Sequence, residues 1–331
     1  MKNGSPAGNI FFDSGEIWKA KSRIAGFVDK TPLIYSAGLS NAFRASVHLK
    51  LEFIQPTRSF KLRGAANMIL SLSEEERQQG VATFSTGNHG FAVAYVAKEL
   101  GIPAAIFISE RVPEVKVNNL RALGANLVIY GDNQDDAEEY CYKKAKAESW
   151  SVVEPFDDPK VIAGQGTIGL ELLEQIPDLD TVIVPLSGGG LISGIALALK
   201  SVLPQSRVIG VSMKGSPTMY YSLKEGKPVI LEEKNTLADS LLGGIGLDNK
   251  YTFQLVRRYV DKVILVNEEA IAAGMASLFK NERLAVEGAA ATTIAALGEK
   301  NLIEPNSRVV LIISGSNIDS KSFINAIKAY L

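Results

Sequence analysis

The chain has 331 residues, of which 35 are basic and 36 acidic, so its net charge is −1. This balance argues against binding to nucleic acid or to an anionic membrane surface. Cys141 is the only cysteine, which excludes an intramolecular disulfide. The first ten residues lack the apolar stretch of a secretory signal, and no window approaches about 18 uninterrupted apolar residues. We therefore expect a cytoplasmic protein without membrane contact.

Short β-branched runs alternate with longer segments of helical period, which predicts a mostly parallel sheet with helices on both faces. The expected strands cover residues 47–53, 81–84, 104–108, 127–130, 181–186, 208–211, 263–266 and 309–313. The expected helices cover residues 62–72, 90–100, 114–123, 135–149, 166–175, 191–201, 268–279, 287–297 and 319–330. No repeat or low-complexity linker separates these elements. We expect two lobes that share a cleft.

Lys61 lies at the start of one expected helix, between Phe60 and Leu62. A lysine in this position is ordinarily a solvated surface charge, and that interpretation stays open. The apolar neighbours favour a second one, because an ammonium group that loses its hydration has a lowered pKa and supplies a free amine. Such an amine can form an imine with an aldehyde.

A glycine-rich turn, Ser-Gly-Gly-Gly at residues 187–190, connects an expected strand to an expected helix. Backbone amides converge in such a turn, and the helix dipole adds partial positive charge, which favours an anion. The turn lacks the Gly-Lys-Ser/Thr of a Walker A loop and the GxGxxG spacing of dinucleotide folds, so one small phosphate fits best. A plain tight turn is the alternative.

Two further strands end in polar residues. The segment Ser-Thr-Gly-Asn-His at 85–89 follows the strand 81–84, and its amides and hydroxyls can receive a substrate carboxylate, while the Asn88 amide can donate to a phenolic oxygen. A helix cap is the alternative for this segment. Ser314 follows the strand 309–313, where a hydroxyl can meet a ring nitrogen. The amine, the anion turn and this hydroxyl match the aldehyde, phosphate and ring nitrogen of pyridoxal 5'-phosphate.

In this order the motifs resemble the fold type II pyridoxal-phosphate enzymes of the threonine dehydratase and serine racemase group, over nearly the whole chain. The resemblance is carried by TPL at 31–33, LKLE at 49–52, SFKLRGA at 59–65, STGNH at 85–89, AGQGT at 163–167, SGGG at 187–190 and SGSN at 314–317. A narrower resemblance, to the hydroxyectoine-utilisation dehydratases, is carried by FDDP at 156–159, VPLS at 184–187, TLADS at 236–240 and GGIGLDN at 243–249.

The resemblance implies an α/β fold of the tryptophan synthase β type, with two lobes that each hold a mostly parallel sheet covered by helices and with the cofactor in the cleft between them. Residues 1–52 and 154–331 would form the large cofactor-binding lobe, and residues 53–153 the small mobile lobe. It also implies a homodimer and a small-molecule amino-acid substrate.

The resemblance further implies that Lys61 is the catalytic residue and carries the cofactor. The other cofactor contacts would be Phe60, Asn88, Ser187, Gly188, Gly189, Gly190, Leu191 and Ser314. The substrate contacts would be Ser85, Thr86, Gly87, Asn88 and His89. Because a neutral hydroxyl does not keep the ring nitrogen protonated, this set favours β-elimination over transamination. The implied reaction removes water and ammonia from a β-hydroxy α-amino acid, and Lys61 takes the α-proton.

Several positions depart from the family. Thr86 stands where serine racemases place a serine, which disfavours racemisation. Ser212 and Thr218 stand where those racemases bind a divalent cation, so we expect no metal. Ser240 replaces a common glycine near the substrate, which points away from plain threonine. The alternatives are a serine or aspartate racemase, a β-replacing synthase, a nucleotide-binding domain without pyridoxal chemistry, and a non-catalytic cofactor- or ligand-binding protein.

Overall fold

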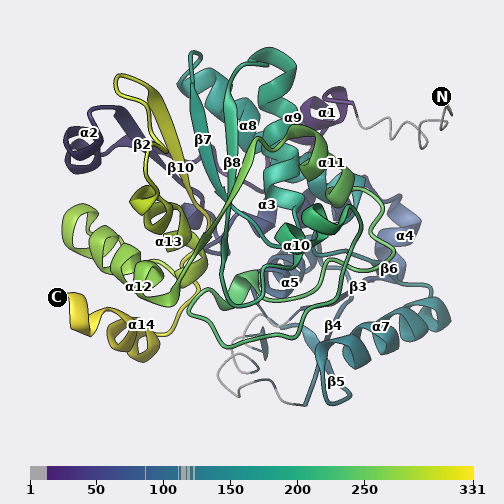
Figure 1. Cartoon of the computed structure of the whole chain (residues 1–331). Helices are drawn as coiled ribbons and strands as arrows, with labels where there is room; N and C mark the ends of the chain where they lie inside the picture. Colours follow the sequence, from purple (N-terminus) through teal and green to yellow (C-terminus); the bar gives the residue numbers. More distant parts are fainter. Residues whose placement is uncertain (1–12, 86, 111, 113–116, 118–119, 122–123) are drawn as a thin grey trace, which may run out of the picture.

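The computed structural model describes residues 13–85, 87–110, 112, 117, 120–121 and 124–331. Its named strands form a six-stranded sheet of order β1-β2-β10-β7-β8-β9 and a four-stranded sheet of order β5-β4-β3-β6 (Figure 1). The larger sheet contains β1 (Leu33–Tyr35), β2 (Ser46–Leu51), β7 (Thr181–Pro185), β8 (Arg207–Met213), β9 (Lys262–Val266) and β10 (Arg308–Ile313). The smaller contains β3 (Val81–Phe84), β4 (Ala104–Ile108), β5 (Asn126–Ile129) and β6 (Ser151–Val152).

All strand pairs in these sheets are parallel except β1 with β2. The eight predicted strands are therefore confirmed, and the parallel α/β architecture with them. The two strands that the sequence pattern missed are the shortest, β1 and β6. Both are too short for a period of two to be visible.

Helices cover both faces of the larger sheet, since alternate side chains of each strand point to opposite faces. Val182 and Val184 of β7 pack with residues of α8 and α9, whereas Ile183 packs with residues of α12 and α13. These helices are α8 (Pro159–Gln175), α9 (Gly190–Val202), α12 (Glu268–Ser277) and α13 (Gly288–Ala295). Burial on both faces explains why these strands are uniformly apolar.

The smaller sheet follows the same rule. Val81 packs with α3 and α5 on one face, and Ala82 packs with α7 on the other. These helices are α3 (Lys61–Ser71), α5 (Asn88–Leu100) and α7 (Gln134–Glu148). Because α3 also contacts α8, it connects the two sheets. The predicted lobe boundaries at residues 53 and 153, and the mobility of the smaller lobe, stay predictions.

Glycines on α8 let two helices approach it closely. A Cβ at Gly164 would lie 2.4 Å from the Arg63 carbonyl oxygen of α3, and one at Gly169 would lie 2.6 Å from Ala198 Cβ of α9. From the α9 side, a Cβ at Gly194 would lie 2.5 Å from the backbone nitrogen of Gly166. The predicted start of this helix at residue 166 was wrong. The helix begins at Pro159 and is capped by Asp158.

A buried ion cluster fixes α3 to its surroundings. The Arg63 guanidinium donates through Nε to Glu52 Oε2 at 2.7 Å and through Nη1 to Glu171 Oε1 at 2.6 Å. Lys50 Nζ donates to Glu171 Oε2 at 2.5 Å. The side chains of Arg63, Glu52 and Lys50 are fully buried, so two cations and two carboxylates balance each other away from water.

Five further helices join the predicted ones: α1 (Gly15–Ile24), α2 (Ala37–Phe43), α4 (Glu74–Gln79), α10 (Thr218–Glu225) and α11 (Thr252–Tyr259). Near the carboxyl end, α14 (Ser320–Ile327) occupies most of the helix predicted for 319–330. The helix predicted for 114–123 falls largely outside the described residues. Within the part of the chain that the structure describes, no helix is long and apolar enough to cross a bilayer.

Candidate active site

A cavity of about 890 Å³ opens where β3, β7 and β10 end. Parallel α/β sheets bind ligands at the carboxyl ends of their strands, because loops and helix amino termini gather there. The predicted site residues that line this cavity are Phe60, Lys61, Ser85, Gly87, Asn88, His89, Ser187, Gly188, Gly189, Gly190, Leu191 and Ser314. Thr86 lies outside the described residues. The structure thus brings together segments more than 200 residues apart in the chain.

Lys61 is the first residue of α3, is half-buried and lines the cavity. Nζ donates to the Pro155 carbonyl oxygen at 2.6 Å and lies 5.4 Å from the centre of the Phe60 ring. Burial lowers the pKa of Lys61 to about 8. Since this partner is a neutral carbonyl, the amine can lose its proton near neutral pH and act as a nucleophile or base.

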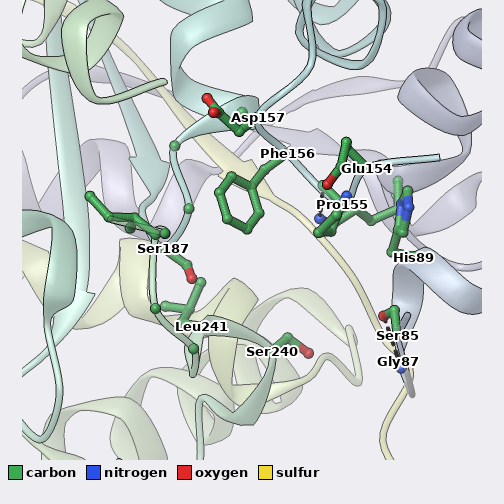
Figure 2. Close-up of a pocket in the computed structure, with 18 of the residues that line it drawn as sticks. Ser85, Gly87, His89, Glu154, Pro155, Phe156, Asp157, Ser187, Ser240 and Leu241 are labelled. Carbon is green, nitrogen blue, oxygen red and sulfur yellow. Dashed lines mark hydrogen bonds between the residues drawn. The ribbon is translucent and has the colours of Figure 1, made fainter. Parts of the chain in front are cut away.

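The turn after β7 is packed so tightly that only glycine fits. A Cβ at Gly188 would lie 2.4 Å from the Phe156 ring, and one at Gly190 would lie 2.9 Å from the Phe156 carbonyl oxygen. Gly189 has φ +92°, a left-handed conformation that glycine adopts without strain. The Phe156 ring faces the segment that carries Ser187 (Figure 2). The free amides at the start of the 13-residue helix α9 therefore border the cavity.

We predict that Gly188→Ala weakens pyridoxal-phosphate binding by roughly ten- to a hundredfold, because the added methyl group must displace Phe156 or the turn. The measurement is a titration of the cofactor-free protein with pyridoxal phosphate, followed by absorbance. Gly38→Ala is the matched control, since nothing lies within 4 Å of a Cβ there. Equal affinities for the two variants would contradict this role of the turn.

A buried amide without a partner also lines the cavity. Gln165 of α8 lines the cavity and is 1% exposed, yet among the described residues neither Nε2 nor Oε1 has a hydrogen-bond partner. An unpaired buried amide is unfavourable unless a ligand or water satisfies it. Gln165 belongs to the AGQGT segment, but no role was predicted for it.

Asn88 and Ser314 line the cavity from different parts of the fold. Asn88 is the first residue of α5, and its Nδ2 donates to Glu287 Oε1 at 2.9 Å. Ser314 follows β10, is 3% exposed, and accepts a hydrogen bond from the Phe60 backbone nitrogen through its carbonyl at 3.1 Å. Both line the cavity, and their predicted roles stay predictions.

His89 is buried beside the cavity, where its Nε2 lies 2.9 Å from the Val153 carbonyl oxygen. Burial, together with the nearby Lys61 charge, lowers the pKa of His89 to about 3, so the ring is neutral. A neutral ring that contacts a backbone carbonyl fits a structural role for His89 rather than acid or base catalysis.

The amino end of α5 carries the predicted substrate segment. Ser85 Oγ accepts from the Gly87 backbone nitrogen at 3.4 Å (Figure 2). Gly87 occupies the N-cap position, and among the described residues no side chain caps the helix. The capping alternative for Ser85 and Asn88 is therefore wrong, and the first amides of α5 remain available to a carboxylate.

The sequence pattern did not predict the carboxylates that line the cavity. Buried Glu287 stands directly before α13, where an acidic residue ordinarily complements the helix dipole. Glu138 lies on α7 and Glu154 follows β6, and no role was predicted for either. No local pattern distinguishes a carboxylate that borders a cavity from one on a surface.

The chain matches the family model described as pyridoxal-phosphate dependent enzyme over residues 24–315. A Sinorhizobium fredii protein assigned as a threonine dehydratase is 47% identical over 94% of this chain and 93% of its own length. The L-threonine ammonia-lyase of Thermotoga maritima is 42% identical over 92% of this chain and 75% of its own length. The solved structure of maize serine racemase has a TM-score of 0.89 at 35% identity, covering 96% of this chain and 97% of the racemase. The chain therefore belongs to the pyridoxal-phosphate dependent enzyme family.

Within that family it is a threonine dehydratase-like lyase of fold type II, and its cofactor is pyridoxal 5'-phosphate. The predicted fold class, enzyme class and cofactor are confirmed. This membership sets aside the nucleotide-binding and non-catalytic alternatives. The residues that hold the cofactor stay predictions, supported by the glycine turn, the Lys61 amine with its lowered pKa and the unpaired Gln165 amide.

Proposed function

We propose that this enzyme removes water and ammonia from a β-hydroxy α-amino acid related to threonine or serine. The single observation that carries the proposal is the Lys61 amine, which lines the cavity and donates to the neutral Pro155 carbonyl. When bound, pyridoxal phosphate supplies an aldehyde and a ring that withdraw electrons from the α-carbon of the substrate. Lys61 then accepts the α-proton, which its lowered pKa of about 8 permits.

The other residues bind and orient. The amides of residues 187–191 would hold the phosphate, the Gln165 amide would bond a polar group of the bound ligand, and the amino end of α5 would hold the substrate carboxylate. Ser314 would place a neutral hydroxyl at the ring nitrogen, which favours loss of a β-leaving group. The Val153 carbonyl keeps His89 in place beside Lys61.

The charge of the cavity supports a narrower proposal, a hydroxyectoine-derived substrate such as a hydroxylated diaminobutyrate. The carboxylates that line it are Asp135, Glu138, Glu154, Asp157, Asp158, Glu233, Asp239, Asp248 and Glu287, against the lysines Lys61 and Lys250. Burial, together with its acidic neighbours, raises the pKa of Glu138 to about 7. A second, cationic amine on the substrate would relieve this excess of negative charge.

Racemisation is the second candidate, because serine racemases are among the relatives. The predicted cation positions of those racemases are occupied by Ser212, whose Oγ lies 3.4 Å from Met213 Sδ, and by Thr218, which donates to the Gly243 carbonyl at 3.3 Å. Neither is a good ligand for a hard cation. The absence of a metal and the cytoplasmic location stay predictions. The homodimer is also a prediction, and size-exclusion chromatography with light scattering would test it.

The test of the proposed function is an ammonia-release screen of the cofactor-loaded enzyme. The substrates are L-threonine, L-serine, the hydroxyaspartate isomers and hydroxylated diaminobutyrates. We expect ammonia and an α-keto acid in equal amounts, with the highest kcat/KM for a substrate that carries a second amine. Chiral analysis of the recovered amino acid separates the alternatives. Inversion without ammonia would show a racemase, and equal kcat/KM for threonine and the diamines would reject the narrower substrate.

A further inference from the structure

Glu287 is a buried carboxylate whose two oxygens accept hydrogen bonds from amides. It is 2% exposed and lines the cavity. Oε1 accepts from Asn88 Nδ2 at 2.9 Å, and Oε2 accepts from the Asn317 backbone nitrogen at 3.0 Å. These contacts join the start of α5, next to the smaller sheet, to the segment after β10 of the larger sheet.

A second contact fixes the other end of the Asn88 amide. Asn317 Nδ2 donates to Asn88 Oδ1 at 2.5 Å and to the Thr57 carbonyl at 2.9 Å. The Asn88 oxygen therefore faces a donor and its nitrogen faces an acceptor, which determines how the amide is turned. An amide nitrogen carries two hydrogens, and Glu287 accepts only one of them. The second hydrogen stays available for a ligand in the cavity.

The surrounding backbone leaves room for this carboxylate only because residue 315 is glycine. A Cβ at Gly315 would lie 2.7 Å from Glu287 Oε1. The Glu287 backbone nitrogen also donates to the Gly315 carbonyl at 3.3 Å. Gly315 follows Ser314 directly, so the carboxylate is held against the same turn that presents the predicted ring-nitrogen contact.

We propose that Glu287 is a positioning residue, which turns the Asn88 amide so that its second hydrogen points to the phenolic oxygen of bound pyridoxal phosphate. The inference rests on the proposed function, since it takes Asn88 as a cofactor contact. Glu287 acts through Asn88 and does not itself touch the reacting atoms. Its role is to keep one hydrogen-bond donor correctly oriented inside a cavity that is otherwise acidic.

The ionisation of Glu287 supports this role. Burial and the charge of Asp239 raise the pKa of Glu287 to about 7, although the hydrogen bonds from Asn317, Asn88 and Ser240 act to lower it. Lys61 lines the same cavity. Above this pKa the carboxylate accepts from both amides, and below it one oxygen carries a hydrogen and competes with them. The orientation of Asn88 should thus loosen as the pH falls through about 7.

The test compares wild-type holoenzyme with Glu287→Gln. The glutamine presents an NH₂ group to either Asn88 Nδ2 or the Asn317 nitrogen, so one donor must face another donor. We expect the visible absorbance of the bound cofactor to change with pH near 7 in the wild type and not in E287Q. We also expect E287Q to bind pyridoxal phosphate roughly two- to tenfold more weakly, the loss of about one hydrogen bond. Glu282→Gln is the control, because Glu282 accepts from Ser36 outside the cavity.

A double variant shows whether the effect passes through Asn88. In an Asn88→Ala background, E287Q should change neither the affinity nor the pH transition any further. An undiminished effect of E287Q in that background would overturn the proposal, and so would an unchanged transition in folded E287Q holoenzyme. If E287Q does not fold, Asn317→Ala takes its place and should weaken cofactor binding by the same factor, and wild-type affinity there would overturn the proposal.

Failure of the inference is distinguishable from failure of the proposed function. A wild-type protein that binds pyridoxal phosphate and releases ammonia, together with an unaffected E287Q, removes only the role of Glu287. A wild-type protein that binds the cofactor but releases no ammonia removes the proposed reaction, while the absorbance and affinity of E287Q still test the positioning.

Discussion

Replacing Lys61 by alanine is expected to abolish ammonia release, with a loss of at least roughly 10³-fold in kcat/KM. The alanine has no amine to hold the cofactor or to accept the α-proton, and the nearby ring of His89 is neutral and held by backbone. The measurements are ammonia release and mass spectrometry after borohydride reduction. Wild-type protein should retain a pyridoxyl adduct on Lys61 and the variant should not.

Lys250→Ala is the matched control for this experiment, because Lys250 is the other lysine that lines the cavity. It is exposed, and its contact to Asp157 uses the backbone nitrogen rather than the amine. K250A should keep both the adduct and turnover. A borohydride-stable adduct on a different lysine in K61A, with turnover retained, would contradict the assignment of Lys61.

Replacing Arg63 by methionine is expected to lower the free energy of unfolding by about 3–5 kcal/mol. Methionine fills much of the same space, but Glu52 and Glu171 are left buried with Lys50 as their only cation in the cluster. A buried carboxylate without its partner is costly, since burial opposes its charge. The measurement is urea unfolding of the cofactor-free protein, so that cofactor binding does not add to the difference.

Arg308→Met provides the comparison, because the ion pair of Arg308 with Asp178 is about half exposed, at 46% and 59%. Its loss should cost less than about 1 kcal/mol. Adding Glu52→Gln to R63M removes the unbalanced charge and should recover part of the lost stability. Equal destabilisation by R63M and R308M would show that the buried cluster contributes no more than a surface pair.

Most of the fold was accessible from the sequence because the buried strands are long, apolar and separated by periodic helices. Pattern-based prediction fails where an element is short, as in β6, or where its glycines serve packing rather than flexibility, as at Gly164 in α8. The close approach of α3 and α8 depends on residues about 100 positions apart. No local window contains that information.

The site residues also divide into those that a local sequence motif predicts and those that depend on distant parts of the chain. Lys61, Asn88 and Ser314 were accessible because each follows a strand or starts a helix in a recognisable motif, and the structure places all three at one cavity. Glu287 could not be predicted from the sequence, since its proposed role depends on a hydrogen bond with Asn88, which is 199 residues away in the chain. The acidic character of the cavity likewise arises from α7, the turn before α8 and the segment before α11 together.

The glycines of α8 have a consequence for the cofactor. Lys61 opens α3 and Gly190 opens α9, and both helices rest backbone to backbone against α8. The distance between the predicted attachment point, Lys61, and the predicted anion-binding turn therefore depends on how closely α3 and α9 pack against α8. Residues 164, 166 and 169 do not border the cavity, yet a bulkier residue at any of them would push a neighbouring helix away from α8 and change the distance between the two predicted cofactor contacts.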